Sequence, residues 1–446
     1  MNSVSDDHPF VSAPHATLMS MSFPVLFSLI AEPLTGLADT AFVARLGTAP
    51  LAALGVGTMT LSSVFWIFNF LGIGTQTEVA RAEGRGEKRR AVEVGGLALA
   101  LGLIFGGLLI VAGFPLMSPA AALMGATDAV REHAVAYMRV RLLGAPAVLV
   151  SIAAFGVLRG LQDMRTPLWV AVGVNVLNLL LDALFIFGWG PVPALGIFGA
   201  ALASTISQWA GAAWTVRVVY LRLGMPKQVR AADAYRLLRV GGDLFVRTGL
   251  VTAFLLLTTR SATQIGADAG AAHQAIRQFW MFTALFLDAF AITGQSLVAY
   301  FMGQGRADQV RRVAKVVCLW SMGFGLALGI FMGIVREGMI HLLVPPPAAD
   351  LFRSAWLVAA LMQPVNALAF ATDGIHWGTG DYRFLRNVMI AATATGVTGI
   401  LLTDAGQPGA LTHVWEVTTL WVTVRAIFGI MRIWPGMGQS PIARKA

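Results

Sequence analysis

The sequence predicts an all-α membrane protein with twelve transmembrane helices, arranged as two parallel lobes of six helices each. Three observations support this fold class: the composition, the length of the apolar segments, and a repeat that relates the two halves of the chain. The 446 residues are 57% hydrophobic and 12% charged, and their mean hydropathy is +0.71. Because soluble domains carry about 25% charged residues, this composition indicates a chain surrounded by lipid.

Twelve apolar segments are long enough to cross a bilayer. A helix needs about 20 apolar residues to span the hydrocarbon core, whereas a strand of a membrane barrel is about half as long and alternates in polarity. The segments are too long and too uniformly apolar for strands, so they predict helices. In chain order they cover residues 17–44, 50–79, 91–117, 130–157, 166–188, 194–221, 236–261, 270–300, 312–335, 351–376, 384–403 and 411–433.

Basic residues gather in the loops after even-numbered helices. Cytoplasmic loops carry an excess of Lys and Arg, so these loops and both termini are expected in the cytoplasm of a multi-pass protein of the bacterial inner membrane. This anchoring explains the net charge of +9 without nucleic-acid binding, because no compact basic domain is predicted. The loops after the second, sixth and eighth helices hold Arg81, Arg85, Lys88, Arg89 and Arg90; Arg217, Arg222, Lys227, Arg230 and Arg236; and Arg306, Arg311, Arg312 and Lys315.

The two halves of the chain match when one is shifted by 218 or 219 residues. A nearly constant offset over this span indicates an internal repeat. The matched pairs are Gly47 with Gly266, Gln76 with Gln295, Gly84 with Gly303, Gly86 with Gly305, Pro146 with Pro364, Gly160 with Gly378 and Asp163 with Asp381. The predicted organisation is an N-terminal tail (1–16), a first lobe (17–221), a linker (222–235), a second lobe (236–433) and a C-terminal tail (434–446). In transporters such repeats hold the substrate at their interface.

A single aspartate, Asp39, lies inside the first apolar segment. An Asp at the centre of a membrane helix costs roughly 2.5 to 3.5 kcal/mol on insertion scales, so it usually faces a cavity, a partner or an ion path. Glu32, Thr35 and Asp39 recur at helical spacing and share one face of the first helix. Pro33 removes a helix hydrogen bond and offers a point for bending.

A second polar face lies on the fifth predicted helix, where Asn175, Asn178 and Asp182 recur at the same helical spacing. The two faces can satisfy each other within one lobe, and Ser204 or Thr205 can add an oxygen. Two carboxylates in a low-dielectric pocket cannot both ionise cheaply, so this pair is expected to hold a proton near neutral pH. The alternatives are structural: Asp39 as a cap, Asp182 as an interfacial acid, and Glu32 as a partner for backbone that Pro33 leaves free.

Several segments resemble the multidrug and toxic compound extrusion (MATE) family, in its DinF-like branch. The stretch from Glu32-Pro33-Leu34 through Ala38-Asp39-Thr40 to Leu46-Gly47 is similar to the family's first-helix signature. Further similar segments lie along residues 20 to about 390: Arg159-Gly160-Leu161-Gln162-Asp163 with Thr166-Pro167; Asn175, Asn178 and Asp182; Gly196-Ile197-Phe198-Gly199; Leu287-Asp288-Ala289; Gly303-Gln304-Gly305; Asp373-Gly374-Ile375; and Gly378-Thr379-Gly380-Asp381.

The resemblance implies a cation-coupled antiporter that expels organic, often cationic and amphipathic, compounds by alternating access. In the DinF-like branch it implies that Asp39 is the coupling carboxylate, supported by Asp182 and Asn178. It also implies that Asp373 and Asp288 occupy family positions in the second lobe. Another branch binds sodium there with one acid on the seventh helix and one on the tenth, but here the seventh helix carries Arg247 and Arg260, so such a pair is incomplete.

The sequence leaves the transported ion open, since sodium also accepts a shell of oxygen ligands such as those of the first lobe. We expect transported protons, no cofactor, no bound metal, small organic substrates, contacts with membrane lipids, and a monomer. The alternative function is a flippase or exporter of a lipid-linked or other anionic metabolite, which Arg139, Arg141, Arg247, Arg260 and Arg277 would suit. An enzyme is not expected, because no HExxH, GxSxG, paired-Cys or phosphate-loop pattern occurs, and the lone Cys318 excludes an intramolecular disulfide.

Overall fold

The computed structural model describes residues 8–224, 226 and 231–443. The predicted linker 222–235 and the two predicted tails therefore lie partly outside the described residues. The described chain is almost entirely helical, with an isolated β-bridge between Trp189 and Val192. It divides into two compact units. The first unit is Phe27–Gly241, and the second unit is Met1–Leu26 together with Gly242–Ala446.

The boundaries between the units fall inside two helices, α2 (Pro14–Ala44) and α11 (Ala231–Ile265). The lobe limits drawn from the sequence repeat stay a prediction. The first unit also contains α3 (Thr48–Ile67), α4 (Asn69–Gly84), α5 (Lys88–Gly113), η1 (Phe114–Leu116), α6 (Met117–Leu123), α7 (Asp128–Leu142), α8 (Ala145–Gly160), α9 (Arg165–Phe187) and α10 (Gly196–Leu223). The second unit contains α1 (Pro9–Ser12), α12 (Ala267–Gly303), α13 (Ala307–Leu343), η2 (Pro346–Ala348), α14 (Ala349–Leu361), α15 (Gln363–Thr379), α16 (Tyr382–Leu401) and α17 (Ala410–Ile433).

Within the described residues, nine helices are long and apolar enough to cross a membrane, or up to eleven if each bent helix pair counts as one span. Each of the twelve predicted segments falls mainly on helices, including residues 194–221, most of which lie on α10. The chain is therefore an all-helical membrane protein, as the sequence predicts.

Three predicted spans are broken, a feature that the apolar runs do not predict. The second span forms α3 and α4, which meet at Phe68. The fourth forms α7 and α8, bent by 50°, and the tenth contains α14 and α15, bent by 45°. Pro146 and Pro364 lie in the first turn of the second helix of the two bent pairs, where a proline that lacks an N–H interrupts the hydrogen-bond ladder. The apolar runs continue through all three breaks, so hydropathy alone does not reveal them.

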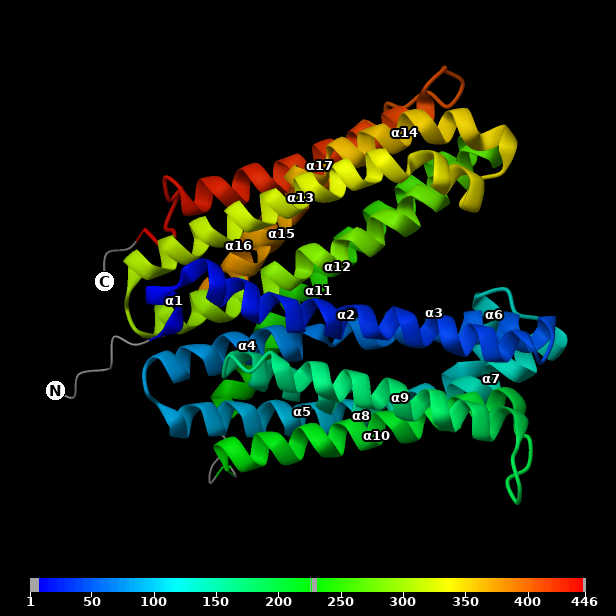
Figure 1. Cartoon of the computed structure of the whole chain (residues 1–446), viewed down its shortest axis with the longest axis horizontal. Coiled ribbons are helices and arrows are strands. Elements are labelled where there is room, and N and C mark those ends of the chain that lie inside the picture. The colour runs from blue at the N-terminus through cyan, green and yellow to red at the C-terminus, as the bar shows by residue number, and fades with distance from the viewer. Residues whose placement is uncertain (1–7, 225, 227–230, 444–446) are drawn as a thin grey trace. The chain divides into compact units, whose positions relative to one another are not determined.

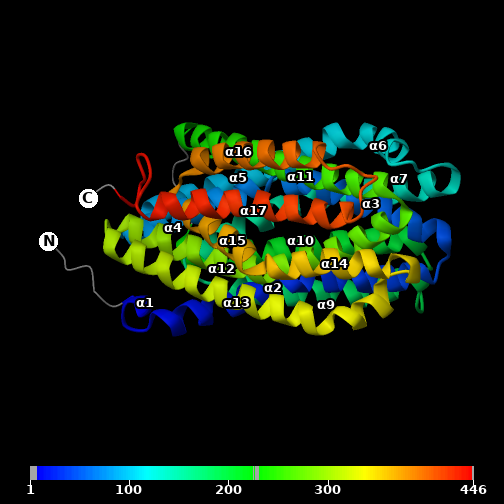
Figure 2. The same ribbon diagram turned by 90° about the horizontal axis from the view of Figure 1, so that it is seen from above.

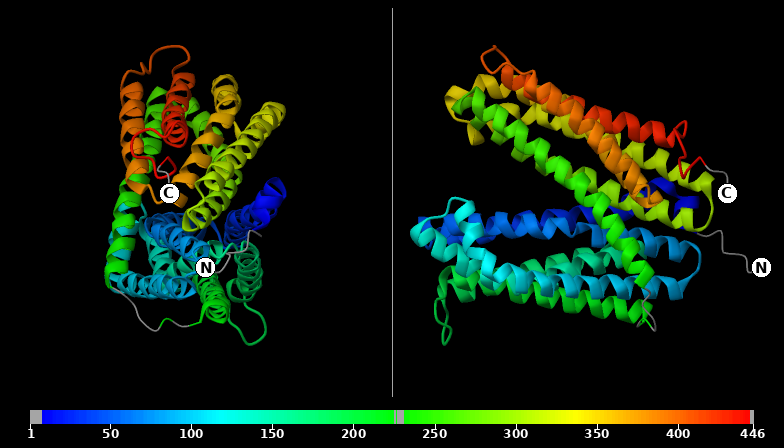
Figure 3. Two further views of the ribbon diagram at one scale, coloured as in Figure 1. Left: turned by 90° about the vertical axis from the view of Figure 1, so that its left-hand side faces the viewer. Right: turned by 180° about the vertical axis from the view of Figure 1, so that it is seen from behind.

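Helices in each unit pack side by side around a core of small and aliphatic residues. In the first unit α8 contacts α4, α5 and α10, while α10 contacts α7 and α9 (Figure 1). In the second unit α15 contacts α12, α13 and α17 (Figure 2). The last two helices, α16 and α17, also run side by side (Figure 3, right).

The packing repeats between the units at the offset that the sequence predicts. A Cβ on Gly160 would lie 2.9 Å from the Gln76 carbonyl oxygen, and a Cβ on Gly378 would lie 2.6 Å from that of Gln295. Gly156 against Gly72 likewise corresponds to Gly374 against Ala291. Only glycine permits backbones to approach this closely, so α4 with α8 and α12 with α15 are two copies of one helix pair.

Candidate functional site

The candidate site of the first unit is a pair of hydrogen-bonded carboxyl groups. Asp39 lies near the end of α2, and Asp182 lies near the end of α9. The side chain of each is hydrogen-bonded to the other. Because an ionised carboxylate only accepts hydrogen bonds, such a bond requires a proton on one of the two groups. Asp182 is completely buried, and Asp39 is partly buried.

Asn178 joins this pair to α10. Its amide nitrogen lies 3.1 Å from Asp39 Oδ1, and its amide oxygen lies 3.3 Å from Ser204 Oγ, in the orientation that satisfies both partners. Asn178 and Ser204 are both buried. Since Asn178 lies one turn before Asp182 on α9, this helix presents an amide and an acid to the same place.

The neighbouring helix α7 adds a cation to the site. Thr205 Oγ1 donates to the Val140 carbonyl oxygen at 3.1 Å, which fixes α10 against α7. The next residue, Arg141, acts electrostatically on both Asp39 and Asp182 and is hydrogen-bonded to the buried Tyr137. The sequence does not identify Arg141 and Tyr137 as members of this site, because they lie about 100 residues from Asp39 and only packing brings them together.

The other predicted residues of the first unit lie outside this network. Asn175 is partly buried, one turn before Asn178. Glu32 and Pro33 are exposed on α2, so the predicted face of Glu32, Thr35 and Asp39 is not uniformly buried. Thr35 Oγ1 donates to the Ala31 carbonyl at 3.1 Å within its own helix.

In the second unit, Asp373 is paired with two arginines. Its Oδ2 accepts from Arg425 Nη2 at 2.7 Å and from Arg247 Nη2, and Asp288 acts electrostatically on Arg425. Asp373 and Arg425 are buried. The two arginine side chains already neutralise the charge of this acid, so binding of a transported cation there would not be favoured. The sequence points to Arg247 but not to Arg425, which lies 52 residues beyond Asp373 on α17.

Among the described residues of the second unit, the repeat places no counterpart of the acid pair. The repeat offset of 219 places Thr258 opposite Asp39, and the offset of 218 places Gly396 and Ile400 opposite Asn178 and Asp182. Beside Gly396 the ring of Phe254 stacks on Trp421, with centroids 4.8 Å apart. An aromatic stack therefore fills the place that the polar network occupies in the first unit.

Five further polar residues in the two units have structural contacts. Glu78 pairs with Arg81 and Arg236, each at 3.7 Å. Asp163 accepts from the backbone N–H of Thr166, in the first turn of α9, at 3.0 Å. Asp381 pairs with Arg432 at 2.8 Å. The buried His376 and His273 lie 3.0 Å from the Gly429 carbonyl and 3.3 Å from Thr259 Oγ1, respectively.

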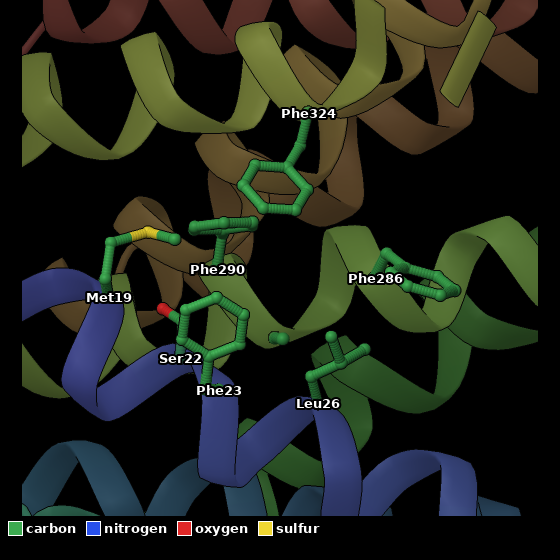
Figure 4. Close-up of a pocket in the computed structure, with 8 residues that line it drawn as sticks. Met19, Ser22, Phe23, Leu26, Phe286, Phe290 and Phe324 are labelled. Atoms are coloured by element: carbon green, nitrogen blue, oxygen red, sulfur yellow. The ribbon is translucent and has the colours of Figure 1, made fainter. Parts of the chain in front are cut away.

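Two hollows lie apart from the acid pair. A cavity of about 10 Å³ between α2, α12 and α13 of the second unit is lined by aromatic and aliphatic side chains with Ser22 (Figure 4). It has room for about one water molecule, so it is a packing gap. An open groove of about 540 Å³ in the first unit is lined by Ser118, Asp128, Arg131, Glu132, Val135, Ala136 and Arg139. Across the residues described, no group of three or more His, Cys, Asp or Glu side chains could hold a metal ion.

Comparison with known proteins points to one family. The MatE family profile matches residues 24–184 and 244–403, once in each half of the chain. "Protein DETOXIFICATION 44, chloroplastic" of Arabidopsis thaliana is 30% identical over 97% of this chain and 85% of its own length. "DNA damage-inducible protein F" of Escherichia coli is 26% identical over 95% of this chain and 93% of its own length.

A solved structure has the same fold. The Vibrio cholerae MATE transporter VcmN in the bent form aligns with a TM-score of 0.88 at 20% identity, covering 96% of this chain and 98% of VcmN. At this identity the likeness concerns the fold alone.

Proposed function

The chain belongs to the MatE family and is a multi-pass secondary transporter that exports compounds, and from this premise we propose that it exchanges organic cations for protons, with Asp39 as the coupling carboxylate. The family resemblance inferred from the sequence is thereby confirmed, and so is the expectation that the protein is not an enzyme.

The observation that carries the proposal is the hydrogen bond between Asp39 and Asp182. A proton shared by the buried Asp182 and the partly buried Asp39 is held where a positively charged substrate would compete for the same negative charge. One site that binds either ligand, but not both, links the release of one to the uptake of the other. Asn178 and Ser204 hold the acids in place without adding charge.

The remaining parts of the proposal follow the family plan. Asn175 extends the polar face of α9, and Pro33 supplies the point at which α2 can bend during alternating access. Glu32 precedes Pro33 and is exposed. We further propose a monomer in the bacterial inner membrane, in contact with lipid, with both termini in the cytoplasm and no cofactor. A flippase of anionic metabolites is less well supported, because Arg247 is paired with Asp373 and Arg277 donates to Thr259 at 2.9 Å.

A comparison of ion gradients tests the coupling. In everted vesicles that contain the protein, a proton gradient without sodium is expected to drive uptake of a fluorescent organic cation, and collapse of that gradient is expected to release it. The measurement is dye fluorescence under a proton gradient, a sodium gradient or neither. Uptake that follows the sodium gradient alone would assign the coupling to sodium and leave the acid pair without its proposed role.

Substitutions around the acid pair test whether it acts as a unit. Asp182→Asn and Asn178→Ala are each expected to lower the export rate and to change its pH dependence, because each removes a partner of Asp39. Combining either change with Asp39→Asn should cause no further loss, since residues of one network are not additive. Export rates of the single and double variants at several pH values provide the measurement, and additive losses would mean that the residues act separately.

A further inference from the structure

We propose that Arg141 is a tethered counter-cation of the Asp39–Asp182 pair and restricts the site to cargo with a single positive charge. This inference rests on the proposed antiport and extends it from the coupling residues to the charge of the substrate. It makes Arg141 a specificity-determining residue.

The geometry of three helices brings Arg141 to the acids. Ser204 binds Asn178, which reaches Asp39, and the adjacent Thr205 binds the carbonyl of Val140, the residue before Arg141. Trp209 Nε1 donates to the Leu143 carbonyl at 3.1 Å, which gives α7 a second attachment to α10. These two contacts fix the backbone on either side of Arg141 against α10, and the guanidinium acts electrostatically on both acids.

Two buried polar atoms at this site have no hydrogen-bond partner among the described residues. They are Nη1 of Arg141 and Oδ1 of Asp182. The donor without a partner belongs to Arg141, and the acceptor without a partner belongs to the acid pair. The site can therefore form one more hydrogen bond as a donor and one more as an acceptor. A buried polar group without a partner is costly, which is consistent with a site whose occupant is exchanged.

Within the part of the chain that the structure describes, Arg141 is the charged side chain that acts on both acids. On α2, Glu32 is exposed, and on α7 Arg139 is exposed and lies over the Phe114 ring. Besides Asp182, the charged residues of α9 and α10 are Arg165, Arg217 and Arg222, at the helix ends distant from the site, and the sequence of α3 has none. Tyr137, Asn178 and Ser204 are neutral, so the charge of the site is set by Asp39, Asp182 and Arg141.

The net charge of the site determines which ions it can bind. Two carboxylates and one guanidinium sum to a single negative charge, which one proton or one monovalent cation neutralises. A buried site strongly favours neutrality because uncompensated charge is expensive in a low dielectric. The wild-type site therefore exchanges about one proton for one monovalent cation, and a divalent cation would leave an excess positive charge.

The same sum of charges predicts that a second substitution restores the activity lost in Asp182→Asn. Asp182→Asn leaves Asp39 balanced by Arg141, so neither a proton nor a cation is required. Arg141→Met restores the need for one positive charge when it is combined with Asp182→Asn. By itself Arg141→Met raises the capacity to two charges and should admit a dication. Arg141→Lys retains the charge and should behave as the wild type.

The test uses ethidium, a monocation, and propidium, a related dication, with purified protein and a pH-indicator dye. Wild type, Arg141→Lys and the matched surface control Arg139→Met are expected to release protons with ethidium and not with propidium. Arg141→Met is expected to gain release with propidium. Asp182→Asn should lower ethidium-linked release on the order of a hundredfold, the factor that an uncompensated charge implies, and Arg141→Met/Asp182→Asn should recover most of it.

The outcomes distinguish this inference from the proposed function. Release by the wild type, together with an Arg141→Met/Asp182→Asn variant that is no better than Asp182→Asn, would overturn the counter-cation role and leave the antiport standing. An Arg141→Met variant that kept the wild-type preference for ethidium would overturn the counter-cation role in the same way. Absence of ethidium-linked release by the wild type would overturn both.

Discussion

Asp39→Asn is expected to abolish export of organic cations while leaving the amount of folded protein unchanged. The amide has nearly the shape of the acid and can still accept from Asn178 and donate to Asp182, so the contacts that hold α2 to α9 survive. It cannot bind and release a proton. In addition, the remaining Asp182 is balanced by Arg141, which removes the negative charge that attracts a cationic substrate.

Export should be measured in cells and in everted vesicles at matched protein level, with substrate-triggered proton release from purified protein as the direct readout. Glu32→Gln is the matched control, because it changes an exposed acid on the same helix and should leave both readouts near the wild-type level. Full resistance of cells that carry Asp39→Asn would remove the residue from the coupling mechanism.

Asp373→Asn is expected to lower stability strongly while affecting coupling little. The carboxylate accepts from Arg425 Nη2 at 2.7 Å and also from Arg247, and it joins α11, α15 and α17. Removing one partner of a buried ion pair typically costs about 3–5 kcal/mol, because the remaining charges stay buried without compensation. Because the proposed coupling site lies in the first unit, each folded molecule of this variant is expected to keep most of its export activity. The loss of the ion pairs should reduce the number of folded molecules.

The measurement is thermal unfolding of purified protein together with export per folded molecule. Asp350→Asn is the control, because Asp350 pairs with Arg353 at 2.8 Å but is exposed, and exposed pairs contribute only about 0.2–1 kcal/mol. The double variant Asp373→Asn/Arg425→Met should be less destabilised than the sum of its single changes. Sodium-dependent export that disappears in Asp373→Asn and persists in Asp39→Asn would move the coupling site to the second unit.

The fold class could be predicted from the sequence because its causes are local and repeated. Long apolar runs fix the helices, and Gly160 and Gly378 mark equivalent close contacts in both halves. The breaks in three spans could not be predicted from hydropathy, since lipid-facing and protein-facing helices have similar compositions. Pro146 and Pro364 are the available signals for two of them, whereas the break at Phe68 has no comparable residue.

The residues of the candidate site that share one face of a helix could be predicted from their spacing in the sequence. Asn178 and Asp182 share a face of α9 because they lie four residues apart, and Asp39 is conspicuous as an acid in an apolar segment. Arg141 and Arg425 are equally charged but less conspicuous, because their roles depend on which distant acid they approach. Spacing within one helix shows which residues share a face, but only tertiary packing shows which two faces meet.

The single cysteine of this chain gives the molecule a practical property. Cys318 is buried on α13, so one substitution with a residue of similar size, such as Ala or Ser, removes every native thiol. Pairs of new cysteines at exposed positions would then carry spin labels or fluorophores without background labelling. One label in each unit would report the distance between the units as protons and substrate are added, so the conformational cycle of the transporter can be followed spectroscopically in lipid.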